Sequence, residues 1–231
     1  MGPQNLAERL HEVRERMARA AREAGRNAHS VTLLAVSKAQ PPSSVVAAAD
    51  LGLTDFGESY LNEALEKIAA LQERELTWHF VGRLQANKTR AIAEHFAWVH
   101  ALDRLKIAER LAAQRPFHAP PLNVCLQVNL GGEASKGGVS PQELGPLAQA
   151  VAALPRLKLR GLMCLPPPEI AVARQRHWFG ALRALRDALN ARGAQLDTLS
   201  MGMSDDFEAA IAEGSTLVRL GTVLFGPRPV Q

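Results

Sequence analysis

Short apolar runs alternate with amphipathic stretches along nearly the whole chain. The apolar runs are rich in branched and aromatic side chains and are bounded by turn residues, which is typical of buried strands. They cover residues 31–37, 54–57, 76–81, 97–101, 122–129, 157–164, 196–200 and 216–220. Between them, apolar positions recur at helical spacing and predict helices near 42–52, 59–72, 86–95, 103–115, 140–153, 169–192 and 205–213.

A further helix is expected before the first strand. Residues 4–25 carry apolar side chains at helical spacing, and Gly25 is suited to end the helix. Strands that alternate with helices predict a parallel α/β architecture, and eight such units favour a closed barrel over an open doubly wound sheet. We therefore expect a single (β/α)8 TIM barrel with an extra N-terminal helix, occupying residues 1–231 as one domain.

Composition narrows the classes of function. No apolar run approaches the roughly 18 residues of a membrane span, and the start lacks a secretory pattern, so a cytoplasmic protein away from membranes is expected. The net charge of +4 could suit nucleic acid, but the arginines are scattered and a single tyrosine offers few stacking surfaces. Cys125 and Cys164 lie in apolar runs without ligand spacing, so we expect buried thiols and no metal site.

The most informative polar residue follows the first predicted strand directly. Lys38 is one of six lysines against twenty-one arginines. Lysine can lose its proton and condense with an aldehyde, whereas a guanidinium stays charged. Lys38 is therefore the candidate for covalent chemistry, with a strand-end lysine that extends into solvent as the alternative.

Two small-residue loops predict a phosphate site. In TIM barrels the active site lies at the carboxyl ends of the strands, and the loops after strands seven and eight often hold a phosphate. The first of these loops contains Met203 and Ser204, and the second contains Gly221 and Thr222. Glycine permits close backbone approach and threonine adds a hydroxyl, so both loops could form halves of one phosphate cradle.

The helix after the first loop is expected to contribute its amino-terminal end. Asp205 and Glu208 have the spacing of a capping box, which would place free backbone N–H groups near an anion. Because the carboxylates of Asp205 and Asp206 would repel a phosphate, we expect both to point away from it.

A reactive lysine beside a phosphate cradle suggests pyridoxal phosphate, or a phosphorylated sugar held as a Schiff base. Arg219 ends the eighth strand and could donate a hydrogen bond to a pyridine nitrogen. A guanidinium cannot accept a proton, so the pyridine would stay neutral and act as a poorer electron sink. Arg219 could instead be an ion-pair residue at the barrel rim.

His79 alternates with Trp78 and Phe80 on the third predicted strand, so its side chain is expected to face the barrel interior. A hydrogen-bonded core histidine is the simpler interpretation. Contact with the ring of a cofactor is the alternative.

Seven segments in order along the chain carry a family resemblance. They are AVSKAQP (35–41), DFGESYLNE (55–63), WHFVGRLQANK (78–88), VNLGGEASKGG (128–138), LRGLMCLPPP (159–168), SMGMSDDFEAAIAEGSTLVRLG (200–221) and FGPR (225–228). Together they resemble the pyridoxal phosphate homeostasis proteins, whose fold is similar to the N-terminal barrel of alanine racemase.

The resemblance implies roles for individual residues. Lys38 would form the internal aldimine with pyridoxal 5'-phosphate, while Ser204, Gly221 and Thr222 would hold the phosphate and Arg219 would face the pyridine nitrogen. Ser59, in the segment DFGESYLNE, stands where the family usually has asparagine. If that side chain contacts the cofactor, its hydrogen bond is shorter-armed or replaced by water.

The resemblance also implies a protein of vitamin B6 and amino-acid homeostasis with no established catalytic activity. Apo enzymes that need the cofactor are possible recipients, and a monomer is expected because no second domain demands dimerisation. A racemase-type enzyme is an alternative, although alanine racemase takes a tyrosine from a second domain and subunit, and the only tyrosine here is Tyr60. An aldolase that uses Lys38 on a sugar carbonyl is a further alternative.

Overall fold

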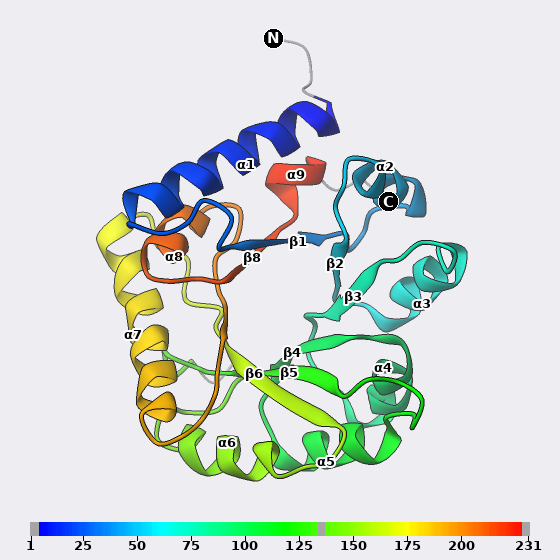
Figure 1. Cartoon of the computed structure of the whole chain (residues 1–231), viewed down its shortest axis with the longest axis vertical. Coiled ribbons are helices and arrows are strands. Elements are labelled where there is room, and N and C mark those ends of the chain that lie inside the picture. The colour runs from blue at the N-terminus through cyan, green and yellow to red at the C-terminus, as the bar shows by residue number, and fades with distance from the viewer. Residues whose placement is uncertain (1–4, 134–136, 228–231) are drawn as a thin grey trace.

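The computed structural model describes residues 5–133 and 137–227, and its strands close into a barrel. Each strand pairs in parallel with the next along the chain, and the last pairs with the first, as Figure 1 shows. The strands are β1 (Thr32–Val36), β2 (Asp55–Glu58), β3 (Thr77–Phe80), β4 (Trp98–Leu102), β5 (Leu122–Gln127), β6 (Leu157–Met163), β7 (Thr198–Ser200) and β8 (Leu217–Leu220). The predicted TIM barrel is confirmed.

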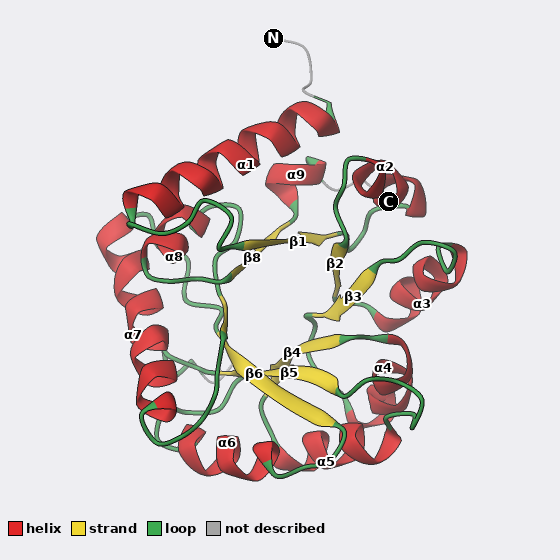
Figure 2. Cartoon of the chain, viewed as in Figure 1, coloured by secondary structure: helices red, strands yellow, loops and turns green. Residues whose placement is uncertain are grey.

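Helices form a layer around the ring of strands (Figure 2). They are α1 (Leu6–Glu23), α2 (Pro42–Asp50), α3 (Leu61–Ala70), the 3-10 helix η1 (Ala86–Lys88), α4 (Thr89–His95), α5 (Leu105–Gln114), α6 (Leu144–Ala152), α7 (Val172–Asn190), α8 (Phe207–Ala212) and α9 (Thr222–Phe225). The predicted helices are found at their places, and α9 is an addition that the apolar pattern did not reveal.

The extra N-terminal helix braces the last two helices of the barrel. It begins at a capping box between Asn5 and Glu8. The Nε of Arg9 donates to the carbonyl of Leu224 in α9 at 2.7 Å. Helix α1 also contacts α8, which lies beside it in Figure 1. This helix therefore supports the segment in which sequence analysis places the phosphate cradle.

Apolar side chains fill the space between barrel and helices. Phe80 and Phe96, both buried, meet edge to face with ring centroids 5.3 Å apart. Cys125 and Cys164 are buried free thiols, as predicted, and burial raises the pKa of each to about 12.

Across residues 5–133 and 137–227, no helix is long and apolar enough to span a membrane, and no residue cluster could hold a metal ion.

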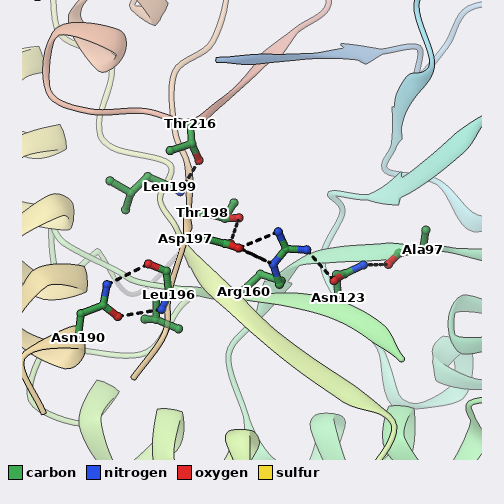
Figure 3. Close-up of polar contacts among 9 residues, drawn as sticks. All are labelled: Ala97, Asn123, Arg160, Asn190, Leu196, Asp197, Thr198, Leu199 and Thr216. Atoms are coloured by element: carbon green, nitrogen blue, oxygen red, sulfur yellow. Dashed lines mark hydrogen bonds and ion pairs between the residues drawn. The ribbon is translucent and has the colours of Figure 1, made fainter. Parts of the chain in front are cut away.

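Arg160 of β6 links the beginning of β5 to the residue that precedes β7, as Figure 3 shows. Its guanidinium donates to both carboxylate oxygens of Asp197, at 2.8 to 3.0 Å, and to Asn123 at 3.0 Å. It also lies 4.8 Å from the ring centroid of Trp98. Burial acts to raise the pKa of Asp197, but the hydrogen bonds from Arg160 and Thr198 hold it below its usual value. This network links neighbouring strands on the side of the barrel opposite Lys38.

Candidate functional site

Lys38 follows β1 by two residues and is half-buried at the carboxyl end of the barrel. The next residue, Ala39, has a φ of 60°, a left-handed conformation that is strained for a residue with a Cβ. The backbone N–H of Ala39 donates to Oε1 of Glu63 at 2.7 Å, which stabilises this turn. The backbone beside Lys38 is therefore held in a defined position by a contact from α3.

A buried charged cluster, the Lys67 clamp, fixes the other side of the same turn. It consists of Ser37, Glu58, Glu63 and Lys67. The ammonium of Lys67 donates to the carbonyl of Ser37 at 2.7 Å and to the Oε1 atoms of Glu58 and Glu63 at 2.7 and 2.6 Å. The hydroxyl of Ser37 donates to the same Glu58 oxygen at 2.6 Å.

Both main charges of the clamp are withdrawn from water. Glu58 is fully buried and Lys67 is 2% exposed. Burial raises the pKa of Glu58, and the hydrogen bonds from Lys67 and Ser37 only partly offset this. Oε2 of Glu58 has no hydrogen-bond partner among the described residues. The clamp therefore depends on Lys67, because removing it would leave a buried carboxylate without its counter-charge.

The two predicted phosphate loops meet in space. The backbone N–H of Val223, in the first turn of α9, donates to Oγ of Ser204 at 3.3 Å. Thr222 begins α9 and is exposed. A Cβ on Gly221 would lie 3.2 Å from the carbonyl oxygen of Val36, so glycine lets this turn approach the end of β1 closely. The pairing of β1 with β8 thus brings Lys38 and the start of α9 to the same rim.

The loop after β7 needs glycine for a different reason. Gly202 has a φ of +99°, and a Cβ there would lie 2.7 Å from the Cβ of Ala210. Its carbonyl accepts a hydrogen bond from the backbone N–H of Arg219 at 2.9 Å, which ties the loop to β8. Met203 follows and is 38% exposed. Gly202 therefore sets the course of the chain that carries Met203 and Ser204.

The capping box predicted for Asp205 and Glu208 is wrong. Helix α8 begins after Asp206, without a side-chain cap, and the carboxylate of Glu208 pairs with Arg16 at 2.6 Å. The attraction of a cation on α1 explains why this carboxylate turns outward. Oδ1 of Asp206 accepts the backbone N–H of Met203 at 2.6 Å, so this carboxylate folds back onto its own loop.

Arg219 is nearly buried, at 5% exposure, and it pairs with no carboxylate among residues 5–133 and 137–227, so the ion pair considered as an alternative is not found there. Its Nη1 donates to the carbonyl and hydroxyl oxygens of Ser200 at 2.5 and 2.8 Å. Its Nη2 donates to the carbonyl of Cys164 at 2.9 Å. Within the described part of the chain, these bonds use three of the five guanidinium N–H donors and leave two for a ligand.

His79 lies on the inner side of the barrel wall, with Oδ1 of Asp55 3.1 Å from its Nε2 and Nε2 of His100 2.9 Å from its Nδ1. Both ring nitrogens are therefore engaged, which favours the core histidine interpretation. Ser59 is half-buried after β2, and its carbonyl lies so close to Gly82 that a Cβ there would overlap it. Contact of either side chain with a cofactor stays a prediction.

Sequence analysis missed His100, Ser200, Glu58 and Lys67. His79 and His100 occupy the third position of consecutive strands, and this shared position was the available signal. Lys67 lies on the buried side of an amphipathic helix, where a lysine requires a partner. Neither signal names the partner residue.

A cavity of about 850 Å³ lies away from these residues, between α6, the start of β6 and the segment after α7. Gln149, Lys158 and Arg192 are among its lining residues, and none of the predicted site residues lines it. This cavity is therefore separate from the candidate site, which consists of the residues at the carboxyl ends of the strands.

Comparisons with known proteins identify the family of the chain. The family described as alanine racemase, N-terminal domain, matches residues 9–229. A pyridoxal phosphate homeostasis protein of Pseudomonas aeruginosa is 57% identical over 223 residues, which cover 96% of each chain. The structure of PipY from Synechococcus elongatus with PLP bound has a TM-score of 0.86 and 36% identity, covering 96% of this chain and 100% of that chain. An alanine racemase of Clostridium difficile shares the fold, with a TM-score of 0.73 at 14% identity, over 96% of this chain and 58% of that chain.

The closed parallel barrel and the family match over residues 9–229 define a barrel of the alanine racemase N-terminal class. Within that class, the chain belongs to the pyridoxal phosphate homeostasis protein family. The resemblance carried by the seven sequence segments is thereby confirmed.

Proposed function

We propose that this protein binds pyridoxal 5'-phosphate and serves the homeostasis of vitamin B6 and amino acids in the cell. Lys38 would hold the cofactor covalently through its amine, and Ser204, Gly221 and Thr222 would hold the phosphate. One observation carries the proposal. Lys38 follows β1 and the α9 turn follows β8, and because β1 and β8 are paired, both lie at the same end of the barrel. The relatives with this name and the PLP-bound structure of PipY support it.

The chemistry of the residues fits this cofactor. Gly221 lets the turn after β8 approach the end of β1 closely, and the hydroxyl groups of Ser204 and Thr222 lie beside this turn, a combination that suits a phosphate. Arg219 keeps donors for a pyridine nitrogen, which accepts hydrogen bonds. Met203 and Ser59 are the further residues for which we propose cofactor contact, whereas His79, whose two ring nitrogens are engaged within the barrel, is left as a core histidine.

The same residues indicate holding rather than turnover. Bound pyridoxal phosphate supplies an electron sink, whose strength depends on protonation of its pyridine nitrogen. Arg219 stays protonated and donates a hydrogen bond without transferring a proton, so it leaves that nitrogen neutral. We therefore propose a cofactor carrier, with apo enzymes that require the cofactor as recipients and a monomer in the cytoplasm as its working form.

The proposal is tested by adding pyridoxal phosphate to the purified protein and recording its visible absorbance. We expect a new absorbance band that is lost in Lys38→Ala. Lys88→Ala is the control and should keep the band, since Lys88 lies in η1, after β3 at the same barrel end, but is not the proposed site of attachment. An unchanged spectrum in the parent protein contradicts cofactor binding. Steady turnover of an amino acid that disappears in Lys38→Ala would instead support a racemase-type enzyme.

A further inference from the structure

We propose that Asp55, His79, His100 and Ser200 form a one-way hydrogen-bond chain through the barrel interior that positions Arg219 for the cofactor ring. This Asp55 chain, as we call these four residues, rests on the proposed function only for the group that Arg219 meets. None of the four is assigned to the cofactor itself by this inference, so each is a positioning residue.

The chain crosses the barrel through consecutive contacts between β2, β3, β4, β7 and β8. Oδ1 of Asp55 lies 3.1 Å from Nε2 of His79, and Nδ1 of His79 lies 2.9 Å from Nε2 of His100. Nδ1 of His100 lies 2.8 Å from the hydroxyl of Ser200, which lies 2.8 Å from Nη1 of Arg219. His79, His100, Ser200 and Arg219 are all at least 95% buried, whereas the side chain of Asp55 is 26% exposed.

The direction of every bond follows from the Asp55 end. Hydrogen bonds from His79 and Thr54 outweigh burial and hold the pKa of Asp55 below its usual value, so its carboxylate only accepts. Nε2 of His79 must then carry the proton. Burial lowers the pKa of both His79 and His100, so each ring is neutral and has one donor nitrogen and one acceptor nitrogen.

The remaining assignments are forced in turn. Because Nδ1 of His79 is an acceptor, Nε2 of His100 donates to it. Nδ1 of His100 is then an acceptor and takes the hydroxyl hydrogen of Ser200. The hydroxyl oxygen of Ser200 keeps only lone pairs for Arg219, which can only donate. A carboxylate at one end of the barrel thereby fixes an acceptor for the guanidinium at the other end.

The chain cannot serve as a path that delivers protons to Arg219, because a guanidinium accepts none. Its effect on Arg219 is therefore orientation. The hydroxyl and carbonyl of Ser200 and the carbonyl of Cys164 take three donors and fix the plane of the guanidinium, so the other two N–H groups have set directions. Oriented donors of this kind strengthen binding because their ordering is complete before the ligand arrives.

The surroundings contain few groups that could compete for these bonds. The ring of Trp98 stacks on His79, with centroids 5.5 Å apart and planes 7° apart, and the guanidinium of Arg160 lies over Trp98. The charge of Arg219 helps to lower the pKa of His100, and the thiols of Cys164 and Cys125 and the carboxylate of Asp206 act on the pKa of Arg219. Both thiols stay protonated, because burial raises their pKa to about 12.

The first test measures the tautomers of the histidine side chains by nitrogen-15 NMR on protein without added cofactor. We expect His79 and His100 to be neutral with the proton on Nε2 at pH 7. A proton on Nδ1 of His100, or a charged ring at either position, overturns the inference. This result does not depend on cofactor binding, so it separates the chain from the proposed function.

The second test breaks the chain at its two ends and measures the dissociation constant and visible spectrum of bound pyridoxal phosphate. Ser200→Ala removes an acceptor of a charged donor and is expected to weaken binding about tenfold. Its control is Ser215→Ala, because Ser215 is equally buried and its hydroxyl donates to a backbone carbonyl, with that of Met201 nearest at 2.7 Å. The control should leave binding and spectrum unchanged.

At the far end, Asp55→Asn removes the charge that fixes the direction of the chain. We expect about threefold weaker binding and a shift of the cofactor spectrum, carried through three intervening side chains. Its control is Asp197→Asn, because Asp197 is a carboxylate at the same barrel end that pairs with Arg160 instead. Spectra of Asp55→Asn and Ser200→Ala that match the parent, in protein that binds the cofactor on Lys38, overturn the inference. If the parent protein does not bind pyridoxal phosphate at all, this result contradicts the proposed function instead.

Discussion

Gly202 shows how one residue without a side chain sets the course of the loop that we propose for the phosphate. Its left-handed backbone and the nearby Cβ of Ala210 both exclude a larger residue. Gly202→Ala should therefore lower the free energy of unfolding by about 2 kcal/mol, measured by urea denaturation. Gly145 in α6 has an ordinary φ and no atom within 4 Å of an added Cβ, so Gly145→Ala should be neutral or stabilising. Equal losses in the two variants would contradict this explanation.

Also at the residue scale, the sequence was sufficient to identify candidate residues that lie in the loops after the strands. Lys38, Ser204, Gly221 and Thr222 lie within four residues after the ends of their strands, and the rule that parallel barrels gather these ends at one rim was sufficient to group them. His100 and Ser200 are 100 residues apart, and their hydrogen bond depends on side-chain direction within the closed barrel. Periodicity carries no information on such a contact.

At the scale of elements, the Lys67 clamp joins β1, β2 and α3 beneath the turn that carries Lys38. Lys67→Met should lower the free energy of unfolding by roughly 3 kcal/mol, because it leaves the buried Glu58 carboxylate without its counter-charge. Lys106→Met is the control, since Lys106 is exposed, and it should change stability by less than about 0.5 kcal/mol.

A second variant separates the charge effect from lost packing. Glu58→Gln combined with Lys67→Met removes both charges, and we expect this double variant to recover part of the stability that Lys67→Met loses. Equal or greater instability in the double variant, measured by the same denaturation, would show that the packing of Lys67 dominates.

Elements were predicted where their periodicity was long enough to read. The strands and the larger helices appear at their expected places, whereas α9 was missed. Its four residues, Thr222–Phe225, follow β8 after Gly221 and span little more than one helical turn, so they are too few for helical spacing to be recognised. The failed capping box at Asp205 and Glu208 has a tertiary cause, because Arg16 on a distant helix takes the Glu208 carboxylate.

For the whole molecule, the buried histidines make stability depend on pH. Burial lowers the pKa of both His79 and His100 in the folded state, most strongly for His100. Below the unfolded pKa of about 6.5, the unfolded chain therefore binds protons that the folded barrel does not. The free energy of unfolding should fall as pH drops from 6.5, by at most about 1.4 kcal/mol per pH unit for each histidine.

Denaturation curves between pH 7 and 5 measure this slope. His100→Gln should reduce the slope, whereas His11→Gln should preserve it because His11 is exposed on α1. An unchanged slope in His100→Gln would contradict the assignment of the proton uptake to the barrel interior. This pH dependence concerns the stability of the whole barrel, because the hydrogen bonds around His100 connect β2, β3, β4, β7 and β8.

The central claim is that Lys38 bonds covalently to pyridoxal phosphate, and peptide mapping tests it most directly. The protein would be incubated with the cofactor, reduced with borohydride, digested and analysed by mass spectrometry. We expect one modified peptide, with the added mass on Lys38. Modification of another lysine alone, or no modification after incubation, would contradict the claim.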